Sequence, residues 1–165
     1  MLEILTGALG GALVSSIAAP YILRGPERRS TRAEVMKAVL RLERVRWAHH
    51  GGSTYHDFNA AIIDLKATAM IAGVDSKLVD KYTYLAAVAR SASDEDLDRT
   101  SDVEYGGGIS SSLSDLVRHS AKAVMFALRS PIRARLIRTS TMEEIDALIA
   151  KEKKHTTANW SVTTL

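Results

Sequence analysis

Three histidines lie close together in the sequence and carry the side chains to bind a metal ion. They are His49, His50 and His56, and Asp57 adds a carboxylate beside the third. Metal sites on a helix usually place two histidines four residues apart on one face, whereas adjacent helical residues point about 100° apart. The spacing therefore favours a polar helix end, and we expect no metal and no other cofactor. A metal site built from these three histidines is the weaker alternative.

Arg44 and His49 form a second candidate pair, in the spacing Arg-x4-His. An arginine can bind a phosphate group and a histidine can act as general acid or base. The spacing resembles the motif of helical ribonuclease domains of the HEPN type. The resemblance implies cleavage of an RNA phosphodiester, with Arg44 on the phosphate and His49 as acid or base. The rest of the sequence carries no specific catalytic motif, so a role without catalysis is favoured over this enzyme.

Two clusters of arginines indicate a negatively charged partner. Each Lys or Arg close to an anionic lipid surface contributes about 1 kcal/mol to binding. The first cluster directly follows an uncharged apolar segment, which favours lipid over nucleic acid, and the second alternates with Ile and Leu, as is typical of a short interfacial helix. The arginines expected to contact headgroups are Arg24, Arg28, Arg29, Arg32, Arg133, Arg135 and Arg138.

The segment before these arginines, from Ile4 to Leu23, contains no charged residue. A helix of this length spans about 30 Å, which matches the hydrocarbon core of a bilayer. We therefore predict a transmembrane anchor over residues 1–23 and a basic linker over 24–32. Lys and Arg gather on the cytoplasmic side of a span, so the N-terminus is expected outside and the remainder in the cytoplasm. A buried core helix and a cleaved signal peptide are the alternatives.

Small residues recur at every fourth position of this segment. They are Gly7, Gly11, Ser15 and Ala19. Small side chains at this spacing let a second helix approach closely enough for backbone contacts. We therefore expect the chain to self-associate through this face.

Beyond residue 32 the hydrophobic spacing predicts an all-α protein. Apolar residues recur three and four apart over about 31–50, 54–72, 76–92 and 112–129, and the short connections between the first three favour an up-and-down bundle. Residues 93–109 are acidic, contain three consecutive glycines and are expected to form a loop. Pro131 begins a short basic helix, and a capping box from Thr141 to Glu144 begins another. The predicted fold is thus an N-terminal transmembrane helix, then about four bundle helices and one or two short C-terminal helices.

The predicted organisation is a bundle over 33–130, short helices over 131–154 and a polar tail over 155–165. The absence of cysteine agrees with a reducing compartment. The sequence favours a membrane-anchored module for assembly or partner binding at the cytoplasmic face of a membrane. Its expected partners are the lipid bilayer, further copies of the chain and an unidentified protein, but not nucleic acid. The alternatives are a membrane-disturbing effector that oligomerises through its anchor and a membrane-tethered ribonuclease.

Overall fold

The computed structural model describes residues 28–47, 54–99, 108–156 and 158–162. Within these ranges every regular element is a helix, and no strand is present. The first helical stretch covers residues 28–45 and is called the 28–45 helix below. Five helices follow it: α2 (Tyr55–Ile71), α3 (Ser76–Arg99), α4 (Ser111–Arg129), α5 (Pro131–Leu136) and α6 (Arg138–Glu152). The helical bundle predicted from the sequence is confirmed over these residues.

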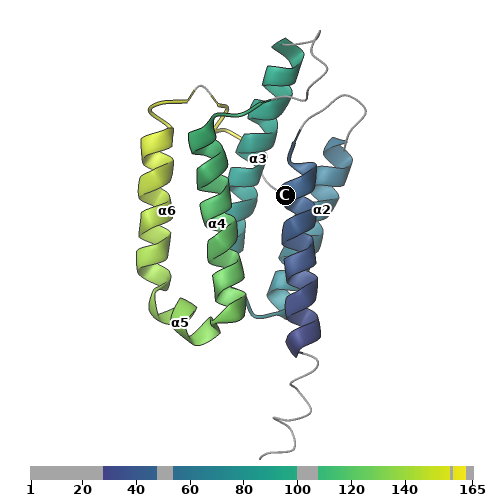
Figure 1. Ribbon diagram of the computed structural model, residues 1–165, viewed down its shortest axis with the longest axis vertical. Coiled ribbons are helices and arrows are strands. Elements are labelled where there is room, and N and C mark those ends of the chain that lie inside the picture. The colour runs from purple at the N-terminus through teal and green to yellow at the C-terminus, as the bar shows by residue number, and fades with distance from the viewer. Residues whose placement is uncertain (1–27, 48–53, 100–107, 157, 163–165) are drawn as a thin grey trace, which may run out of the picture.

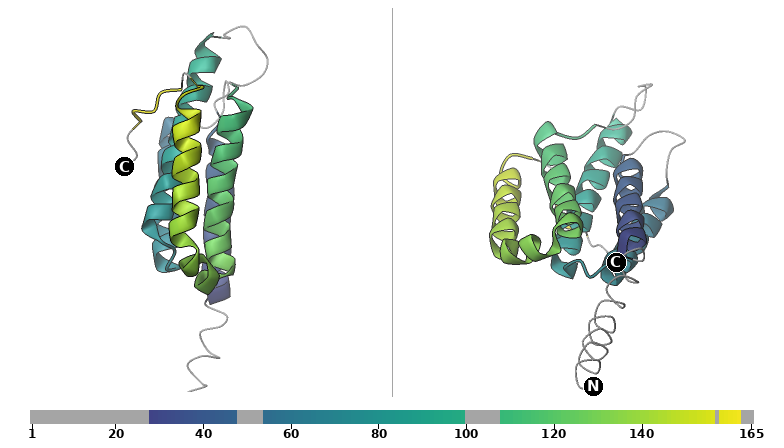
Figure 2. Two further views of the ribbon diagram at one scale, coloured as in Figure 1. Left: turned by 90° about the vertical axis from the view of Figure 1, so that its left-hand side faces the viewer. Right: turned by 60° about the horizontal axis from the view of Figure 1, so that its bottom comes forward.

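The long helices stand side by side and alternate in direction along the chain (Figure 1). The short helix α5 lies across the lower end of the bundle and connects α4 to α6. Helix α3 packs against both α2 and α4, while α6 packs on α4 at the outside. The start of the 28–45 helix, the turn between α2 and α3, and α5 therefore share one end of the bundle (Figures 1 and 2). We call this end the α5 end.

One contiguous apolar core fills the space between the helices. Residues three and four apart lie on one face of a helix, so each long helix contributes a stripe of buried side chains. Fully burying a side chain such as Leu85 contributes about 1.5–3 kcal/mol to folding. The largest buried apolar side chains include Leu42, Phe58, Leu65, Tyr82, Leu85, Leu113 and Ile145.

Local sequence fixes several helix ends. Thr54 forms a capping box at the start of α2: its Oγ1 accepts a hydrogen bond from the Asp57 amide at 3.1 Å, and Asp57 Oδ2 accepts one from the Thr54 amide at 2.9 Å. Gly73 follows α2 with a φ of 71°, the left-handed conformation that favours glycine and ends many helices. The chain thereby turns within a few residues into α3, which keeps α2 and α3 antiparallel neighbours.

The predicted fold included a transmembrane helix, and the structure contradicts this part of the prediction. No helix among the described residues is long and apolar enough to cross a bilayer. The helices are amphipathic instead, since the face opposite the core carries charged pairs such as Lys37 with Glu34. The segment for which the span was predicted, residues 1–23, lies outside the described residues.

Two helix boundaries also differ from those predicted. Helix α3 continues to Arg99, so residues 93–99 are helical although their acidic composition predicted a loop. Pairs one turn apart stabilise this extension: Arg90 with Asp94 at 3.0 Å and Arg99 with Glu95 at 3.7 Å. Helix α6 begins at Arg138, ahead of the predicted capping box, because the Ile137 carbonyl already accepts a hydrogen bond from the Thr141 amide.

Candidate docking surface

The two arginine clusters of the sequence come together at the α5 end. Arg28, Arg29 and Arg32 lie in the first turns of the 28–45 helix, while Arg133 and Arg135 lie on α5, about a hundred residues later. In the right-hand view of Figure 2, both elements face the viewer. None of these five guanidinium groups forms an ion pair with another residue of the described ranges. Arg24, the remaining member of the first cluster, lies outside those ranges.

Arg138 differs from the other predicted headgroup ligands because it is paired within the protein. Its Nη1 donates a hydrogen bond to Asp75 Oδ2 at 2.7 Å, which ties the start of α6 to the turn between α2 and α3. Asp75 also accepts a hydrogen bond from the Lys77 amide through Oδ1 at 2.9 Å, as a side chain does when it caps a helix. We therefore assign Arg138 a structural role. Arg129 is exposed at the end of α4 and, like the five arginines above, forms no ion pair with another described residue.

Exposed apolar side chains accompany the arginines. Ile132 and Leu136 on α5 are 79% and 80% exposed, and Ile137 beside them is also exposed. Met70 and Ile71 are exposed at the end of α2, which belongs to the same end of the bundle. The sequence analysis did not single out Met70 and Ile71. Their position shortly before the helix-ending Gly73 could have indicated exposed apolar side chains at this end of the bundle.

Local sequence explains why α5 stands off from the core. Ser130 and Pro131 end α4 and begin α5, since proline fits the first turn of a helix but not its interior. The new helix has only six residues, and none of them is buried. Its side chains therefore add little to the core and are presented to the surroundings, with arginine and aliphatic residues in alternation.

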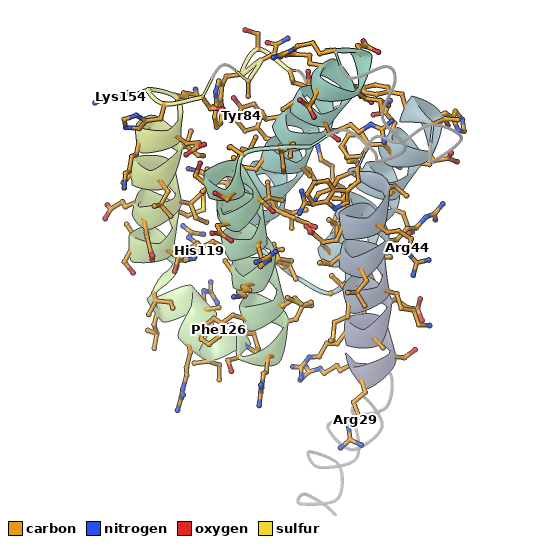
Figure 3. All side chains as sticks on the ribbon, turned by 45° about the horizontal axis from the view of Figure 1, so that its top comes forward. Arg29, Arg44, Tyr84, His119, Phe126 and Lys154 are labelled. Carbon is orange, nitrogen blue, oxygen red and sulfur yellow. The ribbon has the colours of Figure 1, made fainter. Side chains whose placement is uncertain are left out.

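Beneath α5 lies a cleft of about 490 Å³. It is bounded by α4, α5, the start of α6 and the turn between α2 and α3. Figure 3 shows Phe126, one of its lining residues, beside α5, and Arg29 at the same end of the bundle. The apolar lining residues include Val74, Leu78, Phe126, Ile132 and Met142, and Arg135 and Arg138 lie at the edge of the cleft among the polar ones.

Of the three histidines in the weaker metal-site alternative, only His56 lies within the described residues, so that site stays a prediction. No group of three His, Cys, Asp or Glu side chains there is arranged to hold a metal ion. His49 and His50 lie outside the described ranges, and His56 is exposed. The neighbouring carboxylate of Asp57 is engaged in the capping box, where hydrogen bonds from the Thr54 amide and hydroxyl lower its pKa.

The Arg44 and His49 pair stays a prediction, because His49 lies outside the described residues. Arg44 itself is exposed and points away from the bundle (Figure 3). The small residues Gly7, Gly11, Ser15 and Ala19 lie outside the described part of the chain as well. Self-association through them is likewise a prediction.

No family model matches this chain, and no curated protein or solved structure matches it significantly.

Proposed function

We propose that the α5 end of the bundle binds an anionic lipid surface and that the protein acts there as a docking and assembly module. The proposal is carried by the presence of two kinds of side chain at one end of the fold. Six arginines that form no ion pair with another described residue lie at the same end as exposed aliphatic side chains. A membrane-surface site uses both kinds, because basic groups bind headgroups and apolar groups enter the acyl boundary.

The aliphatic side chains favour lipid over nucleic acid. Nucleic-acid surfaces contact phosphates through basic and polar groups and stack bases on aromatic rings. The most exposed apolar residues at the α5 end, including Ile132 and Leu136, are aliphatic and would stay in contact with water on a nucleic acid. A bilayer removes them from water, which contributes about 1.5–3 kcal/mol for each fully buried side chain.

Confinement to a surface raises the effective concentration of the bound copies. We therefore propose that copies bound to the same bilayer associate with one another and with a protein partner.

Cosedimentation of the full chain with vesicles tests the proposal. One set of vesicles contains phosphatidylcholine alone and the other contains phosphatidylserine in addition. The double variant Arg133→Glu and Arg135→Glu should bind the anionic vesicles at least about tenfold more weakly, since each arginine near such a surface contributes about 1 kcal/mol. Added salt should weaken binding of the parent chain in the same direction.

The matched control reverses two charges at the opposite end of the bundle. Lys151 and Lys154 are exposed near the end of α6, and Figure 3 shows Lys154 far from α5. The double variant Lys151→Glu and Lys154→Glu changes the net charge by the same amount and should bind like the parent chain. Equal losses in the two double variants would mean that net charge, and not the α5 end, determines binding.

A further inference from the structure

The cleft beneath α5 shares Ile132 and Arg135 with the exposed surface around it and continues to buried residues such as Leu78. It encloses about 490 Å³, which lies within the range of small-molecule sites, about 300–1,000 Å³. Its walls come from four parts of the chain: Leu78 near the start of α3, Phe126 on α4, Ile132 on α5 and Met142 on α6. Helix α5 forms one wall of this cleft, although none of its own residues is buried.

The volume of the cleft is sufficient for one acyl chain. At about 30 Å³ for a group the size of a water molecule, a space of about 490 Å³ has room for about 16 such groups. A hydrocarbon chain of about that many methylene groups therefore fits the cleft.

The charges at the edge of the cleft indicate an anionic head on that chain. Arg138 lines the cleft but is held by Asp75 at 2.7 Å. Arg135 also lines it, lies on the exposed helix α5 and forms no ion pair with another described residue. An anionic headgroup at Arg135 would gain a charge-assisted contact while its chain replaces water along the apolar walls.

We propose that this cleft binds one acyl chain of an anionic membrane lipid, with the headgroup at Arg135. The inference rests on the proposed function, because the lipid reaches the cleft from the surface that the α5 end contacts. It goes further by assigning a stoichiometric lipid site to a single cleft rather than a general attraction between charges and a surface.

The test uses a monomeric probe in the absence of vesicles. Myristate, kept below its micellar concentration, is titrated into the full chain by calorimetry, and tetradecanol provides the same chain without the charge. The parent chain should bind myristate at a ratio of one to one and tetradecanol more weakly. If the parent chain binds neither compound, the proposed acyl site is wrong. If it binds both equally, the proposed headgroup contact is wrong.

Two substitutions fill the cleft without changing its charge. Ala134→Phe acts from α5 and Ala127→Met acts from α4, and both alanines line the cleft and are half-buried. Each should weaken myristate binding about tenfold or more, because every methylene group kept out of the cleft lowers the affinity. Thermal unfolding followed by circular dichroism verifies that each variant folds. Ala150→Phe, at an exposed position on α6, is the control and should bind like the parent.

The two proposals fail in different measurements. Cleft-filled variants should still bind anionic vesicles through their arginines. If they bind myristate as tightly as the parent, the acyl-chain site is wrong while the docking surface is unaffected. If the parent binds myristate but the double variant Arg133→Glu and Arg135→Glu still binds vesicles like the parent, the docking surface is wrong instead. A partner peptide that competes with myristate for the parent chain would assign the cleft to protein and overturn the lipid assignment.

Discussion

Arg90 of α3 donates a hydrogen bond from Nη1 to the carbonyl oxygen of Trp47 at 2.9 Å, across 43 positions of sequence. The same nitrogen donates to the carbonyl oxygen of Val45 at 3.0 Å, and Nε donates to Asp94 Oδ2 at 3.0 Å. Arg90 is buried, and the two carbonyl groups it contacts lie at the end of the 28–45 helix, where the last carbonyls point out of the helix. A buried arginine thus caps one helix from another and fixes the 28–45 helix against α3.

We expect Arg90→Met to lower the free energy of unfolding by about 2–4 kcal/mol. Methionine retains an apolar stem but removes the guanidinium that donates to Val45, Trp47 and Asp94, and losing a buried charged donor is costly. Urea unfolding followed by circular dichroism measures the change. Arg44→Met is the control because Arg44 is exposed, and it should stay within about 0.5 kcal/mol of the parent.

Tyr82 makes stability depend on pH at the alkaline end. Its hydroxyl donates to Glu43 Oε1 at 2.8 Å, and burial, followed by the charge of Glu43, raises the pKa of Tyr82 far above its ordinary value of 10.0. In the unfolded chain this tyrosine ionises near pH 10, whereas the folded protein keeps it neutral. The free energy of unfolding should therefore fall as pH rises past about 10, because ionisation then favours the unfolded state.

Tyr82→Phe should reduce that fall and cost about 1–2 kcal/mol at neutral pH, since Glu43 Oε1 loses its donor and only Oε2 keeps its hydrogen bond, from Arg46 Nε. Urea unfolding of both proteins between pH 8 and about 11 measures the difference. Tyr55→Phe, at an exposed position, should follow the parent at every pH. The assignment to Tyr82 would be wrong if the two variants lost stability equally above pH 10.

The same substitution, leucine to alanine, at one buried and one exposed position tests which side chains form the core. Leu85 on α3 is 0% exposed and Leu40 on the 28–45 helix is 63% exposed. Leu85→Ala should lower the free energy of unfolding by about 2–5 kcal/mol, because it loses apolar burial and leaves a cavity. Leu40→Ala should change it by less than about 0.5 kcal/mol. Comparable losses at both positions would contradict the packing of the bundle.

The core could be predicted from the sequence because buried residues recur three or four positions apart along each helix. Val35, Val39 and Leu42 recur on one face and are all buried. Met36 and Leu40 extend the same apolar pattern yet are exposed, since hydrophobic spacing gives the direction of a stripe but not its width. The end of α3 was missed for a related reason: acidic composition indicated a loop, while the pairs Arg90 with Asp94 and Arg99 with Glu95 depend on helical geometry.

The candidate site was only half visible in the sequence. The arginines stood out by type and spacing, but their shared end of the bundle follows from the antiparallel order of helices about a hundred residues apart. The engagement of Arg138 by Asp75 is a contact between positions 63 residues apart, which no local pattern reports. The cleft was equally invisible, because it needs α4, α5, α6 and the turn at Gly73 to meet.

Gly73 lets the chain turn between α2 and α3, and this turn carries Asp75 to the cleft. Its φ of 71° is strained for any residue with a Cβ atom, although a methyl group there would meet no heavy atom within 4 Å. Gly73→Ala should therefore cost about 1–2 kcal/mol through backbone strain alone, and Gly73→Asn should cost less, because asparagine tolerates the left-handed region better. Thermal and urea unfolding measure both variants.

Gly108→Ala is the matched control for this turn. Gly108 does not lie in the left-handed region, and the added Cβ would approach only the movable carboxylate of Asp96 at 3.3 Å. The same Asp96 Oδ2 accepts a hydrogen bond from the Gly108 amide at 2.7 Å, and alanine retains this amide donor. We expect a change below about 0.5 kcal/mol at this position. If alanine costs the same at both glycines, the left-handed backbone at Gly73 is not what holds the turn, and Asp75 with its bond to Arg138 must define it instead.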